Sequence, residues 1–356
     1  MGLPNINITF REASASVIRR GERGVVALIL EDDALGIEPF EVITSDDIPE
    51  TLSDFNRDQI EKTMLGYRRP PRRIIVYVVP TGDEVDYAPA KAYLETVRWN
   101  FLAVPNISSG DATAMETWIK GLRDTRKIKV KAVLPNTAAD HEGIINFTTD
   151  NIVVGDRTYT TAEYCARIAG LLAGTPIDIA STFAPLPEVD DHDKMTDKEY
   201  DQAIDRGELV LYYDGEKTKV GRGVNSLQTL TDTKGKSFKK IKIVDAMDLI
   251  YDDIRITAED EYIGKYANSY DNKCLLIVAI QTYLEGLETA GVLQKDMSDV
   301  RIDMEKQMAY LKENGVNVDE LSLQEIKEAN TDDKVFLVSD ISILDAIEEI
   351  TLDINI

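Results

Sequence analysis

Histidine and cysteine, the side chains that most often bind metals or activate nucleophiles, are almost absent from this sequence. The 356 residues contain two histidines, His141 and His192, and two cysteines, Cys165 and Cys274. A tetrahedral zinc site built from these types would need all four residues, and none lies at the spacing that zinc sites use. We therefore expect no such site, and we expect both cysteines to be buried and reduced.

Ser181 is the candidate nucleophile for a serine hydrolase, because it follows the segment Gly174-Thr175-Pro176. A catalytic triad needs an imidazole that is held by a carboxylate and bonded to the serine. Only His141 precedes Ser181, in the loop-like stretch 137–143, and no oxyanion-hole donor can be identified. The sequence therefore predicts no hydrolase activity.

Two further motifs could bind a phosphate or a divalent ion, or could simply form a turn or a loop. Gly221-Arg222-Gly223 lacks the frame of a phosphate-binding loop, so we expect a turn with unusual backbone angles beside a core strand. The run 190–193 (Asp-Asp-His-Asp) contains ligand types for a divalent ion, but nothing fixes their geometry, so we expect a solvated loop. We expect no cofactor and no metal.

The charge balance excludes two classes of partner. The chain has 40 Lys and Arg against 64 Asp and Glu, which gives a net charge of −24. Binding to nucleic acid or to anionic membranes needs concentrated positive charge, so we expect neither. The N-terminus has no signal-peptide pattern and no apolar run is long enough to span a membrane. We therefore expect synthesis in a cytoplasm, with release by lysis as the route out.

Apolar runs alternate with helical patterns through the first half of the chain. This order predicts βαβ units and a mostly parallel sheet. Ser53 is the expected N-cap of the first helix, and Ser109 or Asp111 that of the third. The expected strands are 25–30, 73–79, 101–104 and 128–134, and the expected helices are 54–65, 87–97 and 111–123.

The second half of the chain predicts more helix. Gly170 lies inside an expected helix, where it costs about 1 kcal/mol relative to alanine, so we expect close packing there. Asp214-Gly215 is expected to close a hairpin. The expected strands are 151–155, 208–213, a lysine-rich 236–244 and 335–343, and the expected helices are 161–173, 199–206, 245–255, 271–288, 302–313 and 322–329.

Both ends of the chain have the alternating pattern of a half-buried strand. A lone terminal strand must join a sheet, either in its own subunit or in a neighbour. The polar stretch 11–24 is long enough to cross about 45 Å, and no Lys or Arg follows Val335 to guard against strand pairing. At the N-terminus, Ile6, Ile8 and Phe10 share one face and Asn5, Asn7 and Thr9 the other; at the C-terminus, Ile350, Leu352, Ile354 and Ile356 share one face and Thr351, Asp353 and Asn355 the other.

Charged clusters are a second candidate surface. Arg68 and Arg69 lie in one basic cluster and Lys239 and Lys240 in another, while the pair 252–253 (Asp252, Asp253) is acidic. Each cluster is either a solvated loop or half of a charged contact between subunits. Head-to-tail contacts of this kind generate rings or helices.

Several segments, taken in order, resemble the tail sheath proteins of contractile phages and phage-tail-like bacteriocins. The likeness is strongest to PBSX-like tails and to clostridial R-type, diffocin-like particles. The segments are Gly2–Ile8, Arg20–Gly24, Ala166–Gly170, Val220–Leu230, Tyr262–Ser269 and Asp345–Ile350.

The resemblance implies a fold and a mechanical function. It implies a subtilisin-like central domain in a mixed α/β fold, six-subunit rings stacked as a helical sleeve around a tail tube, and contraction that drives the tube through a bacterial envelope. The partners would be other copies of the chain, the tail tube protein, and the baseplate and tail terminator proteins, within a virion or phage-tail-like particle. The implied tube-facing residues lie on the helix that contains Met304, Lys306, Gln307 and Lys312.

This interpretation divides the chain into five parts and leaves two alternatives. We expect an N-terminal arm and linker (1–24), an N-terminal part of the core (25–85), a central domain (86–235), a C-terminal domain (236–343) and a C-terminal arm (344–356). The alternatives are a soluble α/β enzyme on a related scaffold, which predicts a small oligomer with a ligand cleft, and a non-contractile shell protein, which predicts closed particles.

Overall fold

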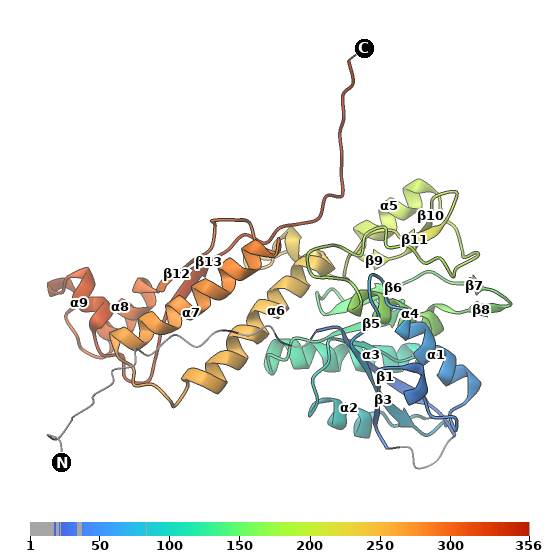
Figure 1. Cartoon of the computed structure of the whole chain (residues 1–356), viewed down its shortest axis with the longest axis horizontal. Coiled ribbons are helices and arrows are strands. Elements are labelled where there is room, and N and C mark those ends of the chain that lie inside the picture. The colour runs from blue at the N-terminus through green and yellow to red at the C-terminus, as the bar shows by residue number, and fades with distance from the viewer. Residues whose placement is uncertain (1–17, 19–20, 22, 34–37, 83, 356) are drawn as a thin grey trace, which may run out of the picture. The chain divides into compact units, whose positions relative to one another are not determined.

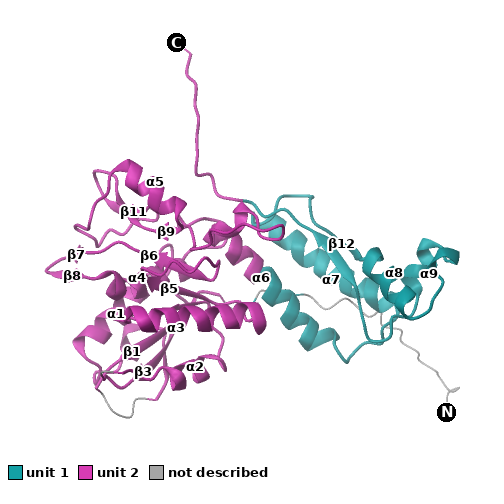
Figure 2. Cartoon of the chain, turned by 180° about the vertical axis from the view of Figure 1, so that it is seen from behind, with its two compact units in different colours: residues 1–21, 249–344 teal, residues 22–248, 345–356 magenta. Residues whose placement is uncertain are grey.

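The computed structural model describes residues 18, 21, 23–33, 38–82 and 84–355, and its contacts divide the chain into two compact units (Figures 1 and 2). One unit comprises residues 22–248 and 345–356, and the other comprises residues 1–21 and 249–344. The expected N-terminal strand, 5–10, lies outside the described residues.

A mostly parallel sheet forms the centre of the larger unit, so the predicted mixed α/β fold is confirmed. Among the described residues, seven strands follow the order β2-β3-β1-β4-β5-β6-β9. Only β2 runs antiparallel to its neighbour. The strands are β1 (Val25–Glu31), β2 (Phe40–Val42), β3 (Arg73–Val79), β4 (Phe101–Ala103), β5 (Lys131–Pro135), β6 (Ile144–Phe147) and β9 (Glu208–Leu209).

Helices cover both faces of this sheet (Figure 1), which explains why its strands are continuously apolar. On β1, Val26 and Leu28 belong to the core beneath one pair of helices, whereas Ala27 and Ile29 belong to the core beneath the other pair. The first pair is α1 (Asp54–Met64) and α4 (Thr161–Ala173), and the second is α2 (Ala88–Leu94) and α3 (Ser109–Lys120).

Gly170 lets α4 approach α1 closely, as the sequence predicted. A Cβ atom at this position would lie 2.1 Å from the backbone oxygen of Thr63 on α1. The Thr63 hydroxyl also donates to the backbone oxygen of Ala166, 3.2 Å away. Any side chain at position 170 would therefore force the two helices apart.

The predicted strand 151–155 is confirmed as β7 (Ile152–Val154), which forms a hairpin with β8 (Arg157–Tyr159). The strand β6 was not expected, and two local predictions were wrong. The N-cap of α3 is Ser108. The lysine-rich segment 236–244 is not a strand, because a 3₁₀ turn η3 (Lys236–Lys239) is followed directly by α6 (Ile241–Thr257).

The remaining elements of the larger unit surround the sheet. Asp214 and Gly215 close the hairpin of β10 and β11, as predicted. These elements are η1 (Ser45–Asp47), the π-helical turn η2 (Gly121–Thr125), α5 (Asp197–Asp205), β10 (Leu211–Tyr213) and β11 (Thr218–Val220).

The smaller unit is mostly helical and contains a two-stranded ribbon. The boundary between the units falls within α6, after residue 248. Leu311, Val318 and Ile326 form a small core between the helices of residues 304–328. Its elements are η4 (Ala258–Tyr262), α7 (Tyr270–Thr289), β12 (Asp299–Ile302), α8 (Met304–Glu313), η5 (Val318–Glu320), α9 (Leu323–Glu328) and β13 (Leu337–Asp340).

Beyond β13 the structure describes residues 341–355 without a helix or strand, apart from an isolated bridge at Ile343. The expected strand 349–356 is therefore not paired within the single chain over its described part. No helix among the described residues has the length and apolarity needed to cross a bilayer.

Candidate assembly surfaces

The serine and histidine that could have formed a hydrolase site have other surroundings. Ser181 is buried, and its Oγ has no hydrogen-bond partner among the described residues. A Cβ atom at Gly223 would lie 2.6 Å from that oxygen, so backbone closes over it. The His141 ring instead contacts Asp124, Glu142 and the backbone N–H of Gly143. Among the described residues, therefore, His141 does not activate Ser181.

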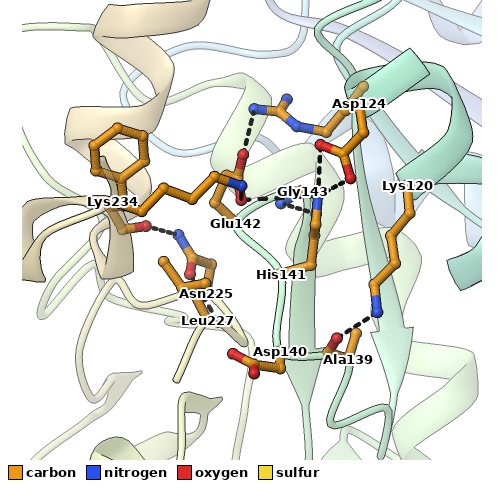
Figure 3. A network of polar contacts seen from close by, with 12 residues as sticks. Lys120, Asp124, Ala139, Asp140, His141, Glu142, Gly143, Asn225, Leu227 and Lys234 are labelled. Carbon is orange, nitrogen blue, oxygen red and sulfur yellow. Dashed lines mark hydrogen bonds and ion pairs between the residues drawn. The ribbon is translucent and has the colours of Figure 1, made fainter. Parts of the chain in front are cut away.

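His141, Asp124 and Glu142 form a polar cluster that the sequence did not predict (Figure 3). The Gly143 N–H donates to His141 Nδ1 at 2.9 Å, so the neutral ring carries its proton on Nε2. That Nε2–H faces the Asp124 carboxylate at 3.3–3.4 Å. Both ring nitrogens are therefore occupied by hydrogen bonds, and neither offers a lone pair to a metal.

Cations complete the cluster. Lys234 donates to Glu142 Oε2 at 2.9 Å, and Arg123 lies 3.9 Å from Glu142 Oε1. Burial opposes the charge on Glu142, but these neighbours and His141 outweigh it and hold its pKa below the ordinary value. Burial also lowers the pKa of His141. The cluster is a charge-balanced structural network.

The segment 220–230, the most recognisable motif of the sequence, bonds the loop that holds this cluster through both side-chain and backbone donors. The Ser226 hydroxyl donates to the His141 backbone oxygen at 2.9 Å, and Asn225 Nδ2 donates to the Phe238 backbone oxygen at 2.7 Å. The amides of residues 228 and 229 both donate to Asp140 Oδ1. The motif thus joins loop 139–144 to the segment before α6 (Figure 3).

The expected unusual backbone at Gly221 and Gly223 is wrong. Neither glycine has a positive φ angle. A Cβ atom would lie 2.6 Å from Ser181 Oγ at Gly223 and 3.3 Å from Val210 at Gly221, so close approach is the reason for glycine at position 223. The Arg222 side chain between them bonds Glu348 near the C-terminus, with Nε and Nη2 at 3.0 and 2.9 Å from Oε2.

The run 190–193 is tied to the surrounding loops. Asp190 accepts from the Gly155 amide, Asp191 pairs with Lys194, and Asp193 accepts from Asn151. His192 is buried, and its Nδ1 lies 2.7 Å from the Asp193 backbone oxygen. The predicted solvated loop is therefore only half right, because its histidine is internal.

The C-terminal residues present a row of apolar side chains to solvent. Ile350, Leu352 and Ile354 are 84%, 75% and 76% exposed. They alternate with Thr351 and Asp353, which preserves the predicted two-faced pattern. An exposed apolar row of this kind is typical of a surface that is covered in an assembly.

The ribbon of β12 and β13 is a surface with unpaired strand edges. Val300 pairs with Ser339 and Ile302 with Leu337, and within the described residues neither strand has a further partner strand. A two-stranded ribbon is marginally stable alone, and its outer edges can accept another strand. Three exposed apolar side chains flank its ends, namely Met297, Val335 and Ile341.

The basic clusters differ in whether their side chains bond other residues of the same chain. Arg68 and Arg69 are exposed, and Arg68 stacks on the Tyr67 ring. Lys239 donates to Gln228 at 3.1 Å, while Lys240 pairs with Asp345 and Glu348 of the same chain.

The two residues of the acidic pair 252–253 also have different surroundings. Asp253 is buried and accepts from the Gly21 amide and the Tyr283 hydroxyl. Asp252 lies 3.6 Å from Arg255. An intersubunit role for these charges stays a prediction.

The predicted tube-facing residues lie on different sides of α8. Lys306 and Lys312 are exposed, and Met304 packs against the small core. Gln307 is buried and donates to the backbone oxygen of Ile326.

The comparisons with known proteins agree with one another. Residues 79–226 match the family model of the phage tail sheath protein central domain, and residues 233–356 match that of the phage tail sheath C-terminal domain. The chain is 39% identical over 360 residues to the tail sheath protein of Clostridium phage phiCD119, which covers 99% of both chains.

Two solved structures have the same fold. The crystal structure of a sheath tail protein from Desulfitobacterium hafniense has a TM-score of 0.72 at 18% identity, covering 84% of this chain and 94% of that one. The helical sheath of the anti-feeding prophage in its contracted state has a TM-score of 0.74 at 14% identity, covering 100% and 99%.

Proposed function

The chain belongs to the phage tail sheath protein family, and we propose that it works by exchanging its terminal arms between neighbouring subunits. It is a structural tail sheath subunit and not an enzyme, as the sequence predicted. The observation that carries the proposal is the exposed apolar row Ile350, Leu352 and Ile354. A single subunit leaves this row uncovered, and a neighbouring copy of the chain is the partner that we propose for it.

The ribbon of β12 and β13 is the acceptor that we propose for the arms. It offers unpaired backbone groups at its outer edges and exposed apolar side chains at its ends. Addition of a strand satisfies the backbone of both partners, and alternate side chains supply the apolar contact. The N-terminal run 5–10, by its two-faced pattern, would be added in the same way.

Contraction follows from subunits that stay linked by their arms while their bodies rotate. Six-fold rings would stack as a helical sleeve around a tail tube, between a baseplate and a tail terminator, in a virion or a phage-tail-like particle. The similarity of the fold to a contracted helical sheath supports a contractile sleeve. The mostly parallel sheet supports the implied subtilisin-like domain. Exposed Lys306 and Lys312 are the candidates for facing the tube, while the buried Gln307 is a weaker one.

Electron microscopy of the purified chain at high concentration tests the proposal. The full chain should form hollow tubes of constant width, whereas chains lacking residues 350–356 or 1–20 should remain folded and unassembled. Normal tubes from either deletion would overturn exchange of the arm that was removed. Closed particles would favour the shell alternative, and a small oligomer of uniform size would favour the enzyme scaffold.

The charge-patch prediction needs a variant that leaves the chain's own ion pairs intact. Lys240 pairs with Asp345 and Glu348, so its reversal would disturb the subunit itself. Among the described residues the Lys239 side chain bonds the neutral Gln228, so Lys239→Glu is the cleaner test. Unchanged tubes from that variant would remove this patch from the interface.

A further inference from the structure

The Glu348 side chain is buried in a socket of three donors from separate segments of the larger unit. Its exposed fraction is 8%. Thr182 Oγ1 donates to Oε1 at 2.6 Å, while Arg222 and Lys240 Nζ donate to Oε2 at 2.9–3.0 Å. Thr182 precedes β10, Arg222 follows β11, and Lys240 precedes α6. One carboxylate therefore joins three parts of the fold.

The neighbouring residues reinforce the same attachment. Asp345 pairs with Lys240, and Glu349 lies 3.2 Å from Arg222. Burial opposes the charge on Glu348, yet the hydrogen bonds from the three donors outweigh it and keep its pKa below the ordinary value. The carboxylate is thus ionised and fully bonded at neutral pH.

The attachment ends abruptly along the chain. Glu348 is almost fully covered, whereas Ile350, two residues later, is 84% exposed and begins the apolar row. The exposed row therefore starts at a fixed point on the surface of the larger unit. A fixed starting point lowers the conformational entropy that is lost when the row docks on another subunit.

We propose that Glu348, held by Thr182, Arg222 and Lys240, is the positioning residue that fixes the root of the C-terminal arm and passes tension from the arm into the body of the subunit. This inference rests on the proposed arm exchange. It also explains Arg222 within the motif 220–230 as the partner of a carboxylate at the far end of the chain. The proposed role is mechanical and involves no chemistry.

The first test measures the arm in the unassembled subunit. A nitroxide label at Ile350→Cys, in a Cys274→Ala background, reports mobility two residues from Glu348 by electron paramagnetic resonance. Cys165 is fully buried and burial raises its pKa, so it will not take the label. Glu348→Gln should sharpen the spectrum at position 350, whereas Asp353→Asn, which removes an exposed carboxylate from the same arm, is the matched control and should leave it nearly unchanged. A label at Ile354→Cys should be mobile in every background.

The second test measures assembly. Glu348→Gln should raise the protein concentration needed for tubes by about tenfold, as expected for the loss of one charge-assisted hydrogen bond. Thr182→Val, which removes one donor without changing charge, should act in the same direction with a smaller effect. A urea midpoint close to that of the parent chain will show that each variant is folded.

The outcomes separate failure of this inference from failure of arm exchange. If Glu348→Gln leaves both the label mobility and the tube threshold unchanged, Glu348 is not the fixed root. Suppose that the label becomes mobile in Glu348→Gln but chains lacking residues 350–356 still form normal tubes. Glu348 then does fix the start of the arm, but arm exchange is wrong, and the proposed mechanical role of Glu348 is wrong as well. A mobile label with weakened assembly, and no tubes from the deletion, supports both.

Discussion

Arg123 and Asp248 form a bidentate ion pair that joins the π-helical turn η2 to helix α6 within the larger unit. Arg123 Nη1 donates to Asp248 Oδ2 and Nη2 donates to Oδ1, each at 2.9 Å, and both side chains are almost completely buried. Lys131 of β5 contacts Asp248 and Asp245 from the sheet. Helix α6 is therefore fixed to the sheet just before the chain passes into the smaller unit.

Removing the charge of Asp248 should destabilise the larger unit strongly, because the buried Arg123 would lose both of its hydrogen bonds to a carboxylate and Lys131 would keep only Asp245. We expect Asp248→Asn to lower the free energy of unfolding by about 3 kcal/mol, measured by urea denaturation. Asp252→Asn, whose partly exposed carboxylate lies 3.6 Å from Arg255, is the control and should cost less than about 1 kcal/mol. Equal losses in the two variants would contradict a special role for Asp248.

Stability should fall as the pH drops below about 6.5, the ordinary pKa of histidine. Burial lowers the pKa values of both His141 and His192 in the folded chain. The unfolded chain therefore binds more protons in this range, and each histidine can contribute up to about 1.4 kcal/mol per pH unit. His141→Gln should reduce the slope of unfolding free energy between pH 7.5 and 5.5, and the double variant with His192→Gln should flatten it. An unchanged slope would mean that these rings do not control it.

Two glycine-to-alanine substitutions should have opposite effects. Gly170→Ala should destabilise the chain by about 1–3 kcal/mol, because the new Cβ would lie 2.1 Å from the Thr63 backbone oxygen. Gly286→Ala, on α7, should stabilise it by about 0.5–1 kcal/mol, because a Cβ there meets no atom within 4 Å and alanine favours helix. Thermal unfolding of the two variants beside the parent chain measures both. A stabilised Gly170→Ala would show that α1 and α4 do not need this contact.

The two faces of the C-terminal arm should differ in their importance for assembly. Asn substitution of Ile350, Leu352 and Ile354 should abolish tubes, since burial of each such side chain is worth about 1.5–3 kcal/mol. The melting temperature of the unassembled subunit should stay the same, because these side chains are exposed in the single chain. Ser and Gln replacements of Thr351 and Asn355 are the control for the other face. Sedimentation and electron microscopy give the readout, and tubes from the Asn variant would contradict burial of the apolar row.

Most elements that lie on regular apolar patterns could be predicted. The helix 161–173 begins and ends where the sequence predicts, and strand 73–79 does as well. The continuous apolar run 25–30 predicted a strand, and the structure explains why the run is continuous, because helices cover both faces of the sheet there. One element that was missed is short, the four-residue strand β6, where periodicity carries little information.

The lysine-rich segment 236–244 shows how a local pattern misleads. Ile241 and Ile243 fit the period of a strand, but Ile241, Val244 and Asp248 fit the period of a helix. In a sequence, Asp248 counts as a polar, exposed position, so the pattern does not place it on the buried face of a helix. The helical pattern becomes visible only when its buried partners are known. Asp248 is buried only because Arg123 and Lys131 neutralise it.

By itself the sequence determined the acidic charge, the alternating strands and helices and the two-faced character of the C-terminal arm, because each depends on neighbouring residues. Only the tertiary structure decided which distant charges meet. Arg123 and Asp248 are 125 residues apart, and Arg222 and Glu348 are 126 apart. Such pairs leave no periodic signal, because a single charge at each position suffices and folding alone brings the two together.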